Sequence, residues 1–447
     1  MTTTGFVPPP YPYERIDRFK PLAAEFDGGL VDFSIGTPFD PPPGAVSEML
    51  GASGLERSYP PSIGTPDLRD AVHRWMGRRF GIDVAPTQVA ACIGTKEFVG
   101  TLPQWLRLRR PDLDTILYPA ISYPTYEMGA TLAGCRAVPV LMSPTGGIQL
   151  DSIDEADAER ALALWVNSPG NPNGVVDDLG AAAAWGRTHG VPVFSDECYV
   201  EFTWTGRGRT ILEQGTDGVV AVHSLSKRSN LAGARVGFYA GDPALVEYLR
   251  EVRKHVGMMV PGPAQAAGVV ALDDDQHVEV QRGRYLARLE RLATVLSRWS
   301  GIEIPLPAGG FYLWFHVGDA WDFTERLAAE GGALVSPGDF YGDAGAEYVR
   351  VAVVQPDAQI DLVAARLGVG TSGPRPPDRA ATRPTDGRPI TAPGRGGGDR
   401  AVPAVRRSRR WRRAVRRRRP PARPVGRRAR PSPERLLDHA RLHRDRH

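Results

Sequence analysis

The sequence has little cysteine and no long hydrophobic run. Three cysteines among 447 residues, none at C-x-x-C spacing, argue against a disulfide framework and a zinc site, and the nine histidines show no ligand spacing. No stretch approaches the roughly 20 apolar residues of a membrane span, and the start of the chain lacks the basic and apolar regions of a secretion signal. We therefore expect a cytoplasmic protein without a bound metal or a membrane anchor.

Basic and acidic residues are unevenly distributed along the chain. Residues 371–447 contain 24 arginines, no lysine and six acidic residues, a net charge of +18, whereas residues 1–370 contain 31 basic and 45 acidic residues, a net charge of −14. The Arg, Pro, Gly and Ala content of 371–447 predicts a disordered basic tail. Two origins remain open: an ordinary solvated tail, or out-of-frame or read-through sequence from GC-rich DNA.

The body of the chain alternates apolar β-branched runs with amphipathic stretches, which is typical of an α/β protein. We expect a large domain at 46–270, with a mostly parallel central sheet flanked by helices. The N-terminal segment 1–45 and the C-terminal lobe 271–370 are expected to form a smaller α+β domain. Apolar periodicity predicts helices over 277–299 and 320–331, and GGFYLWFHV and EYVRVAVV are interpreted as strands.

Three predicted strands end in polar residues. The runs ALALWVNSPGNPNG, VPVFSDECYVEF and GVVAVHSLSK place Asn171, Asp196 and Lys227 after successive strands, 25 and 31 residues apart. That spacing is about the length of a βαβ unit. Because parallel strands present their carboxyl ends at one edge of a sheet, these three side chains should converge where such sheets bind ligands.

The chemistry of these residues points to one cofactor. Lys227 is one of only four lysines, and an amine in a pocket can condense with an aldehyde. The buried carboxylate of Asp196 needs a partner, which a pyridinium nitrogen would supply. Hydroxyl, guanidinium and backbone N–H groups suited to a phosphate come from Ser224, Ser226, Arg235, Gly94 and Thr95. Aldehyde, pyridine and phosphate together specify pyridoxal 5′-phosphate.

The chain resembles the fold-type I, class I/II pyridoxal-phosphate aminotransferases over roughly residues 1–370. The resemblance is carried, in the family's order, by SIGTPFDPPP, YPAISYPTY, NSPGNPNG, DECY, SLSKRSNLAGARVGF and EYVRVAV. Asn173 stands where the family usually has threonine. The stretches GTKEF and SLSKRSNLAG are most similar to the bacterial N-succinyldiaminopimelate aminotransferases.

The resemblance implies catalytic roles for three residues. Lys227 would bind the cofactor aldehyde covalently and then move a proton between the substrate Cα and the cofactor. Asp196 would keep the pyridine nitrogen protonated. Tyr199, together with Asn171, would hydrogen-bond the phenolic oxygen of the ring, on which Tyr123 would stack.

The resemblance also implies the remaining binding residues. Cofactor phosphate contacts are expected from Gly94, Thr95, Lys96, Ser224, Ser226 and Arg235. Tyr59 is similar to the tyrosine that reaches the phosphate of the neighbouring subunit, which implies a homodimer with shared sites. Arg350 would hold the substrate α-carboxylate, and Gly36 and Asn171 would line the same pocket.

Several functions remain open at this stage. The first is transfer of an amino group between N-succinyl-LL-2,6-diaminopimelate and 2-oxoglutarate or glutamate, in lysine biosynthesis. The second is another class I/II aminotransferase, acting on aspartate, alanine, aromatic amino acids or LL-diaminopimelate. A protein that binds nucleic acid through its basic tail is the third. For the first, Arg228, Arg253 and Lys254 are candidates to attract the extra carboxylates of the substrate.

Overall fold

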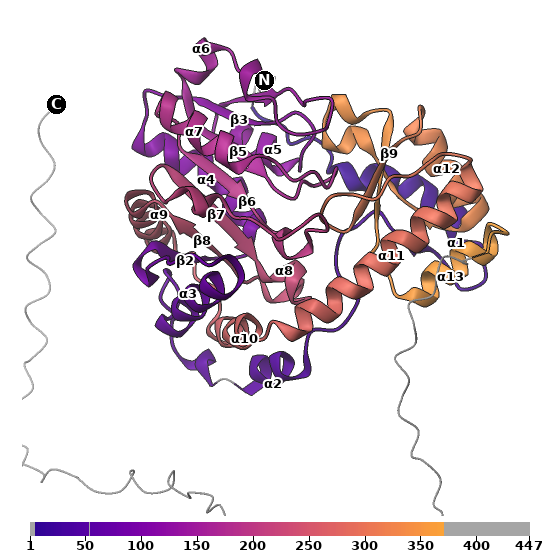
Figure 1. Ribbon diagram of the computed structural model, residues 1–447, viewed down its shortest axis with the longest axis horizontal. Coiled ribbons are helices and arrows are strands. Elements are labelled where there is room, and N and C mark those ends of the chain that lie inside the picture. Colours follow the sequence, from indigo (N-terminus) through magenta and orange to yellow (C-terminus); the bar gives the residue numbers. More distant parts are fainter. Residues whose placement is uncertain (1–4, 53, 371–447) are drawn as a thin grey trace, which may run out of the picture. The chain divides into compact units, whose positions relative to one another are not determined.

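The computed structural model describes residues 5–52 and 54–370, and the predicted basic tail at 371–447 lies outside them. Within the described residues, none of the helices is both long enough and apolar enough to pass through a bilayer. Figure 1 shows a group of strands enclosed by helices, with the long helix α11 (Gln276–Ser300) running from α10 (Gly262–Asp273) toward α13 (Asp357–Arg366).

A seven-stranded sheet forms the centre of this fold. Its strand order is β2 (Val89–Cys92), β8 (Gly237–Gly241), β7 (Val219–Ser224), β6 (Val193–Asp196), β5 (Ala161–Asn167), β3 (Thr115–Pro119) and β4 (Arg136–Val140). All neighbouring strands are parallel except β8, which is antiparallel to both β2 and β7. The predicted α/β fold with a mostly parallel sheet is confirmed.

The inner strands of this sheet are covered on both faces. All seven residues of β5 are buried, and so are all residues of β6 and β7. Such continuous apolar runs are typical of parallel strands between two helical layers. The flanking helices are α2 (Gly44–Ala52), α3 (Pro66–Phe80), α4 (Thr95–Arg109), α5 (Thr125–Leu132), α6 (Glu155–Ala158), α7 (Leu179–His189), α8 (Leu225–Arg228), α9 (Pro243–Val256) and α10.

Two further sheets come from the ends of the described chain. Strands β11 (Ser336–Pro337), β12 (Tyr348–Ala352) and β9 (Tyr312–His316) form an antiparallel sheet, and β1 (Val31–Asp32) pairs in parallel with β10 (Ala333–Leu334). Helices α1 (Lys20–Ala24), α12 (Ala320–Gly331) and α13 accompany them. The pairing of β1 with β10 joins the N-terminal segment to the C-terminal part. The division into domains at 46–270 and at 1–45 with 271–370 remains a prediction.

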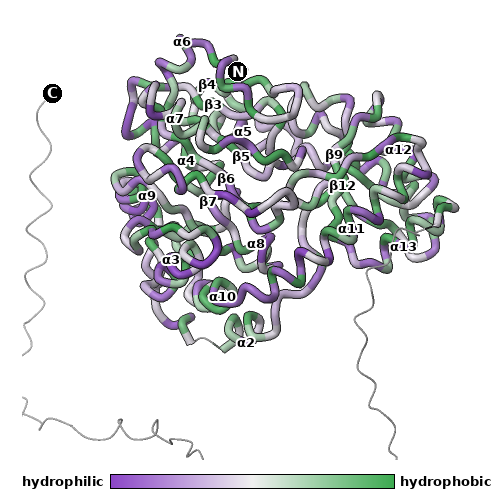
Figure 2. The backbone as a smooth tube through the Cα atoms, in the orientation of Figure 1, coloured by the Kyte–Doolittle hydropathy of each residue, from purple (hydrophilic) through white to green (hydrophobic). Residues whose placement is uncertain are grey.

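Hydropathy along the helices follows their surroundings. Helix α10 packs against α2 and α3, and it is largely green in Figure 2 because most of its residues are apolar. Helix α3 has both colours, as expected for a helix with one buried face formed by residues such as Leu68, Val72 and Trp75. The sequence GPAQAAGVVALD therefore makes α10 an inner helix, whereas α3 separates core from solvent.

Helices α4 and α5 lie unusually close, and this contact positions the residues before and within α5. Gly129 of α5 faces α4, where an added Cβ would lie 2.9 Å from the carbonyl oxygen of Val99 and 3.2 Å from the Cα of Gly100. A side chain at Gly129 would therefore push α5 away from α4. By contrast, a Cβ on Gly100 would meet only the Cγ2 of Thr125, at an ordinary 3.5 Å.

We predict opposite effects for two glycine-to-alanine changes in this contact. Gly129→Ala should lower the free energy of unfolding by about 1–3 kcal/mol, because the added methyl overpacks the helix contact. Gly100→Ala should raise it by up to about 1 kcal/mol, because alanine favours the helical conformation. Urea unfolding of both variants measures the difference. If the free energy of unfolding changed in the same direction in both variants, the close packing of α4 against α5 would not explain the effects.

Candidate active site

A cavity of about 470 Å³ lies at the carboxyl ends of the central parallel strands. Its lining includes Asn167, Asp196 and Ser224, which are the last residues of β5, β6 and β7. Twelve of the fourteen predicted site residues line it, namely Gly36, Thr95, Lys96, Tyr123, Asn171, Asp196, Tyr199, Ser224, Ser226, Lys227, Arg235 and Arg350. The expected convergence of strand ends is therefore observed.

Asp196 is a buried carboxylate held by two hydrogen bonds. The backbone amide of Cys198 donates to its Oδ1 at 3.2 Å, and the hydroxyl of Tyr126 donates to its Oδ2 at 3.1 Å. Burial raises the pKa of Asp196, and the hydrogen bonds from Cys198 and Tyr126 only partly oppose that rise. A cationic ring nitrogen would therefore find a strong acceptor here.

The amine of Lys227 reaches the cavity from the short helix α8. Its Nζ donates to the carbonyl oxygen of Gly36. Burial, with further contributions from the charges of Arg350 and Arg235, lowers the pKa of Lys227 to about 8. A larger fraction of this amine is thus unprotonated near neutral pH than for a lysine in water, which favours a nucleophilic role.

One end of the cavity is built to hold an anion. Arg235 has φ +55°, and its guanidinium donates to the carbonyl oxygens of Ala232 at 2.9 Å and Ile93 at 3.1 Å, with no carboxylate partner among the described residues. Gly94 packs directly on it, since an added Cβ would lie 2.0 Å from the Arg235 Nη2. The hydroxyls of Thr95, Ser224 and Ser226 line the same cavity. Guanidinium, hydroxyls and the start of α4 together suit a phosphate.

A second unpaired arginine lies in the wall formed by β12. Arg350 is 1% exposed, and it donates to the Oδ1 of Asn171 at 2.9 Å and to the carbonyl oxygen of Ser34. Its Nε has no hydrogen-bond partner, and no carboxylate of the described chain pairs with it. A buried guanidinium without a counter-ion is costly, so this position is suited to a carboxylate from outside the chain.

Aromatic residues enclose the space between these groups. The hydroxyls of Tyr199 and Tyr312 lie 2.9 Å apart, and the ring of Tyr312 lies 4.2 Å from the guanidinium carbon of Arg350. Gly36 packs on Tyr312 so closely that a Cβ would lie 2.1 Å from the tyrosine hydroxyl. Tyr123 contacts Tyr126 edge to face at 6.3 Å.

Two predicted residues point away from the phosphate end. Tyr59 is 94% exposed and does not line the cavity of its own chain. The side chain of Lys96 reaches toward the N-terminal segment instead: its Nζ donates to the hydroxyl of Tyr11 at 2.9 Å and lies over the ring of Tyr11 at 4.5 Å. Only the backbone of Lys96 remains available at the start of α4.

Several residues of the site were not identified from the sequence. Tyr11 and Tyr13 from the proline-rich start, Tyr312 from β9 and Asn167 from β5 all line the cavity. The first asparagine of NSPGNPNG was a usable signal for Asn167, whose side chain binds the backbone of both Asp196 and Asn171. The tyrosines had no recognisable signal, because their position depends on packing between distant segments.

None of Arg228, Arg253 and Lys254, the candidates to attract substrate carboxylates, lines the cavity, and each pairs with an acidic residue of the chain. Arg228 is buried against Glu201, and Arg253 forms a two-point ion pair with Glu97 at 2.7 Å. Lys254 is exposed and pairs with Glu251. The local positive charge comes instead from the lining itself, where Lys96, Lys227, Arg235 and Arg350 face the single carboxylate of Asp196.

Several known proteins are similar in sequence to this chain. The model of the family described as aminotransferase class I and II matches residues 29–367. The chain is 42% identical to the 4-dedimethylamino-4-oxo-anhydrotetracycline transaminase OxyQ of Streptomyces rimosus, over 80% of this chain and 99% of the relative. It is 32% identical to the LL-diaminopimelate aminotransferase of Aquifex aeolicus, over 80% of this chain and 96% of the relative.

A solved structure is similar as well. A probable N-succinyldiaminopimelate aminotransferase from Thermus thermophilus superposes with a TM-score of 0.71 at 30% identity, covering 79% of this chain and 98% of that one.

We predict that the Tyr126 hydroxyl stabilises the ionised form of Asp196. Burial already raises the pKa of Asp196 in the folded state, and Tyr126→Phe should raise it further. When the pKa of a carboxyl group is higher in the folded than in the unfolded protein, the free energy of unfolding falls as the pH rises from the unfolded pKa to the folded pKa. The variant should therefore lose more stability at about pH 8 than at about pH 5, with a difference of about 2 kcal/mol.

Urea unfolding of the cofactor-free variant at the two pH values measures this effect. Tyr239→Phe is the matched control, because the Tyr239 hydroxyl is buried but has no hydrogen-bond partner among the described residues. An equal loss at both pH values for Tyr126→Phe would show that its hydroxyl does not act on the Asp196 charge.

Proposed function

The chain belongs to the class I and II aminotransferases, which use pyridoxal phosphate, and on that premise we propose that it transfers an amino group from N-succinyl-LL-2,6-diaminopimelate to 2-oxoglutarate. The observation that carries the proposal is that Arg235 and Arg350 line one cavity and have no carboxylate partner within residues 5–52 and 54–370. Arg235 suits the phosphate of the cofactor, and Arg350 suits the α-carboxylate of an amino or keto acid.

The cavity has the groups that the cofactor requires. Its volume lies in the range of cofactor pockets, about 300–1,000 Å³. Arg235, with Gly94, Thr95, Ser224 and Ser226 around it, would hold the phosphate. When bound, pyridoxal phosphate supplies an aldehyde that condenses with amines and a ring that stabilises negative charge at the substrate Cα.

Three side chains would act on the reacting atoms. Lys227 would bind the aldehyde and, once displaced by the substrate amine, take up and return the proton of the substrate Cα. Its pKa of about 8 suits a group that must both accept and donate. Asp196 would hold a proton on the ring nitrogen, and Tyr199 would hydrogen-bond the phenolic oxygen of the ring, with Asn171 beside it and Tyr123 against the ring face.

Arg350 would bind the α-carboxylate, which all amino-acid and keto-acid substrates share. Its guanidinium is fixed by Asn171 and Ser34, so its planar fork is already oriented before a carboxylate arrives. Excluding water from a buried arginine strengthens its attraction for the carboxylate. The carbonyl of Gly36, adjacent to this position, keeps the Lys227 amine next to the bound substrate.

Lys96 supports a substrate with more than one acidic group. It is an exposed cation at the cavity lining without a carboxylate partner among the described residues, and Tyr11 orients it. A second carboxylate extending from the cavity would meet this ammonium in an otherwise acidic body. N-succinyl-LL-2,6-diaminopimelate has carboxylates beyond the one next to the reacting amine. The similar structure from Thermus thermophilus, named a probable N-succinyldiaminopimelate aminotransferase, supports this choice of substrate.

A second candidate substrate class comes from the relative with 42% identity. OxyQ is described as acting on an oxo-anhydrotetracycline, and the cavity of this chain is lined by Tyr11, Tyr13, Tyr123 and Tyr312. Flat aromatic faces of this kind would also accept a planar keto compound. LL-diaminopimelate, aspartate, alanine and aromatic amino acids complete the set of alternatives.

A donor panel tests the proposed substrate. Purified protein with pyridoxal phosphate and 2-oxoglutarate should give its highest kcat/KM with N-succinyl-LL-2,6-diaminopimelate, above LL-diaminopimelate, aspartate, alanine and tyrosine. Lys96→Met should raise KM for the donor with a distal carboxylate by about tenfold, which is about 1.4 kcal/mol, and leave alanine unchanged. An equal rise for all donors would place Lys96 on the cofactor, and activity only with an oxo-anhydrotetracycline would support the second candidate.

We also propose a homodimer in which each cavity is completed by the other chain. Tyr59 is exposed, and Met49, Leu50 and Leu55 nearby in the sequence are also exposed to 36%, 39% and 40%. Several large apolar side chains on one surface segment are typical of a subunit interface. In such a dimer the Tyr59 hydroxyl would reach the phosphate held by Arg235 of the partner chain.

Mixed dimers test this arrangement. A Tyr59→Phe chain combined with a Lys227→Ala chain forms heterodimers in which one site carries both changes and the other carries neither. Such heterodimers should therefore bind the phosphate group of the cofactor at one site as tightly as the unmodified protein does, and that site should turn over normally. If purified heterodimers show only the affinity and activity of the Tyr59→Phe protein, Tyr59 acts within its own chain.

A further inference from the structure

Two residues of a buried ion pair are close neighbours of site residues in the sequence. Arg228 directly follows Lys227, and Glu201 lies two residues after Tyr199. The Nε of Arg228 donates to the Oε1 of Glu201 at 3.2 Å, and the two side chains are 4% and 5% exposed. The pair therefore joins two site-bearing segments, although neither of its members lines the cavity.

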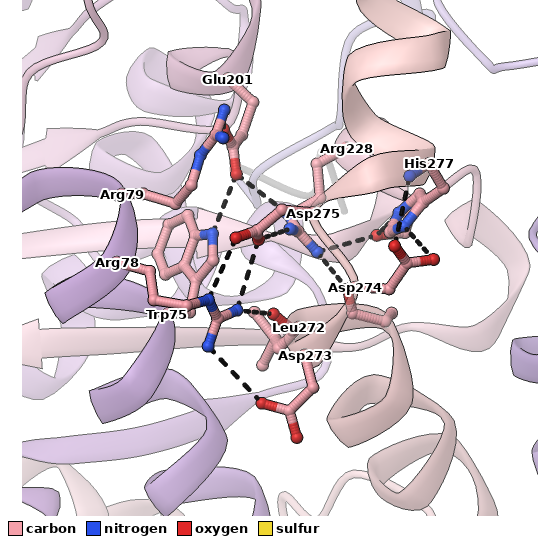
Figure 3. Close-up of polar contacts among 12 residues, drawn as sticks. Trp75, Arg78, Arg79, Glu201, Arg228, Leu272, Asp273, Asp274, Asp275 and His277 are labelled. Atoms are coloured by element: carbon pink, nitrogen blue, oxygen red, sulfur yellow. Dashed lines mark hydrogen bonds and ion pairs between the residues drawn. The ribbon is translucent and has the colours of Figure 1, made fainter. Parts of the chain in front are cut away.

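Figure 3 shows how this pair is embedded. The carboxylate of Glu201 also accepts hydrogen bonds from the Nε1 of Trp75 at 2.9 Å and from the Nε of Arg79 at 2.9 Å, both on α3. On the other side, Arg228 donates to the carbonyl oxygen of Ala271 at 2.6 Å and lies 3.6 Å from Asp275. Arg228 thus ties α8 to two separate parts of the chain, the turn after Tyr199 and the region at the end of α10 that contains Ala271 and Asp275.

The charge balance shows which partner the pair depends on. Burial alone would raise the pKa of Glu201, but the charges of Arg228 and Arg79 outweigh it and hold that pKa below its ordinary value. Without Arg228, Glu201 keeps Arg79 and Trp75 as partners. The fold can therefore retain this carboxylate when Arg228 is replaced, whereas the segment with Lys227 would lose a principal anchor.

That anchor matters because the helix carrying Lys227 is very short. Helix α8 has four residues, too few for a helix to be stable on its own. Among the described residues, the Lys227 amine has one hydrogen-bond partner, the carbonyl of Gly36, so it contributes little to fixing the backbone behind it. The position of α8 must then come from its other side chains: Leu225 is fully buried in the core, and Arg228 makes the polar contacts described above.

We propose that the Glu201–Arg228 ion pair is a positioning device that sets the placement of Lys227 relative to Tyr199. It acts from behind the cavity and touches neither cofactor nor substrate. The pair clamps α8 to the 3₁₀ turn Val200–Phe202, which follows Tyr199 directly. This inference rests on the proposed roles of Lys227 and Tyr199 at the cofactor.

Two variants that remove one arginine each from the same carboxylate test it. Arg228→Met deletes the partner next to Lys227, and Arg79→Met deletes the partner on α3, so the charge lost around Glu201 is the same. The readouts are the midpoint of the pH titration of the visible absorbance of bound pyridoxal phosphate, and the dissociation constant of the cofactor. We expect Arg228→Met to move the midpoint by at least about half a pH unit more than Arg79→Met does, and Arg228→Lys to recover part of that shift.

Each outcome separates the inference from a purely structural role. Equal midpoints for Arg228→Met and Arg79→Met, with melting temperatures lowered in both, would overturn the positioning role. If Arg228→Met does not fold, Arg228→Lys and Arg79→Lys replace the two methionine variants. The midpoint should again shift more for the Arg228 variant than for the Arg79 variant. The proposed role of Lys227 would be refuted if the unmodified protein had no visible absorbance band that titrates, or if the Lys227→Ala protein kept that band. This failure is distinguishable from a failure of the positioning role, which appears only in the comparison of the Arg228 and Arg79 variants.

Discussion

The site depends on two arginines, one buried and one half-buried, that have no carboxylate partner in the part of the chain that the structure describes. Arg235 and Arg350 belong to different parts of the chain, one in the loop before β8 and the other in β12, and both face the same cavity. Within the described chain, their charge is stabilised by backbone carbonyls, by the side-chain amide of Asn171 and, for Arg350, by the tyrosine rings around it. An anionic group at each end of the cavity would satisfy both, and Lys227 and Asp196 lie in the same cavity.

The central sheet makes this arrangement possible. Because β5, β6 and β7 run in parallel and in register, with Asn167 opposite Asp196 and Asp196 opposite Val222, their carboxyl ends form one edge. Short turns after each strand then carry Asn171, Tyr199 and Lys227 into the cavity. The antiparallel strand β8 returns beside β7 and brings Arg235 next to Ser224.

Burial shapes the reactivity of the groups held there. It lowers the pKa of Lys227 to about 8 and raises that of Asp196, so both groups are easier to neutralise than in water. Fixed hydrogen bonds from Tyr126 and Cys198 moderate the effect on Asp196. Behind the cavity, the ion pairs around Glu201 connect α3, the turn after Tyr199 and α8, so residues that never meet a ligand bear on the geometry of those that do.

The sequence by itself determined the fold class, the strand ends and most of the cavity, because apolar runs ending in Asn, Asp and Lys at βαβ spacing have few alternative arrangements. It also indicated Arg350 through the family pattern of EYVRVAV. Only the tertiary structure decided that Tyr11, Tyr13 and Tyr312 join the site, and that Lys96 turns toward Tyr11. It also decided that Arg228 pairs with the buried Glu201 and Arg253 with the half-buried Glu97. Those outcomes depend on contacts between segments tens to hundreds of residues apart, and a basic residue near a motif takes whichever acidic partner the folded chain brings to it.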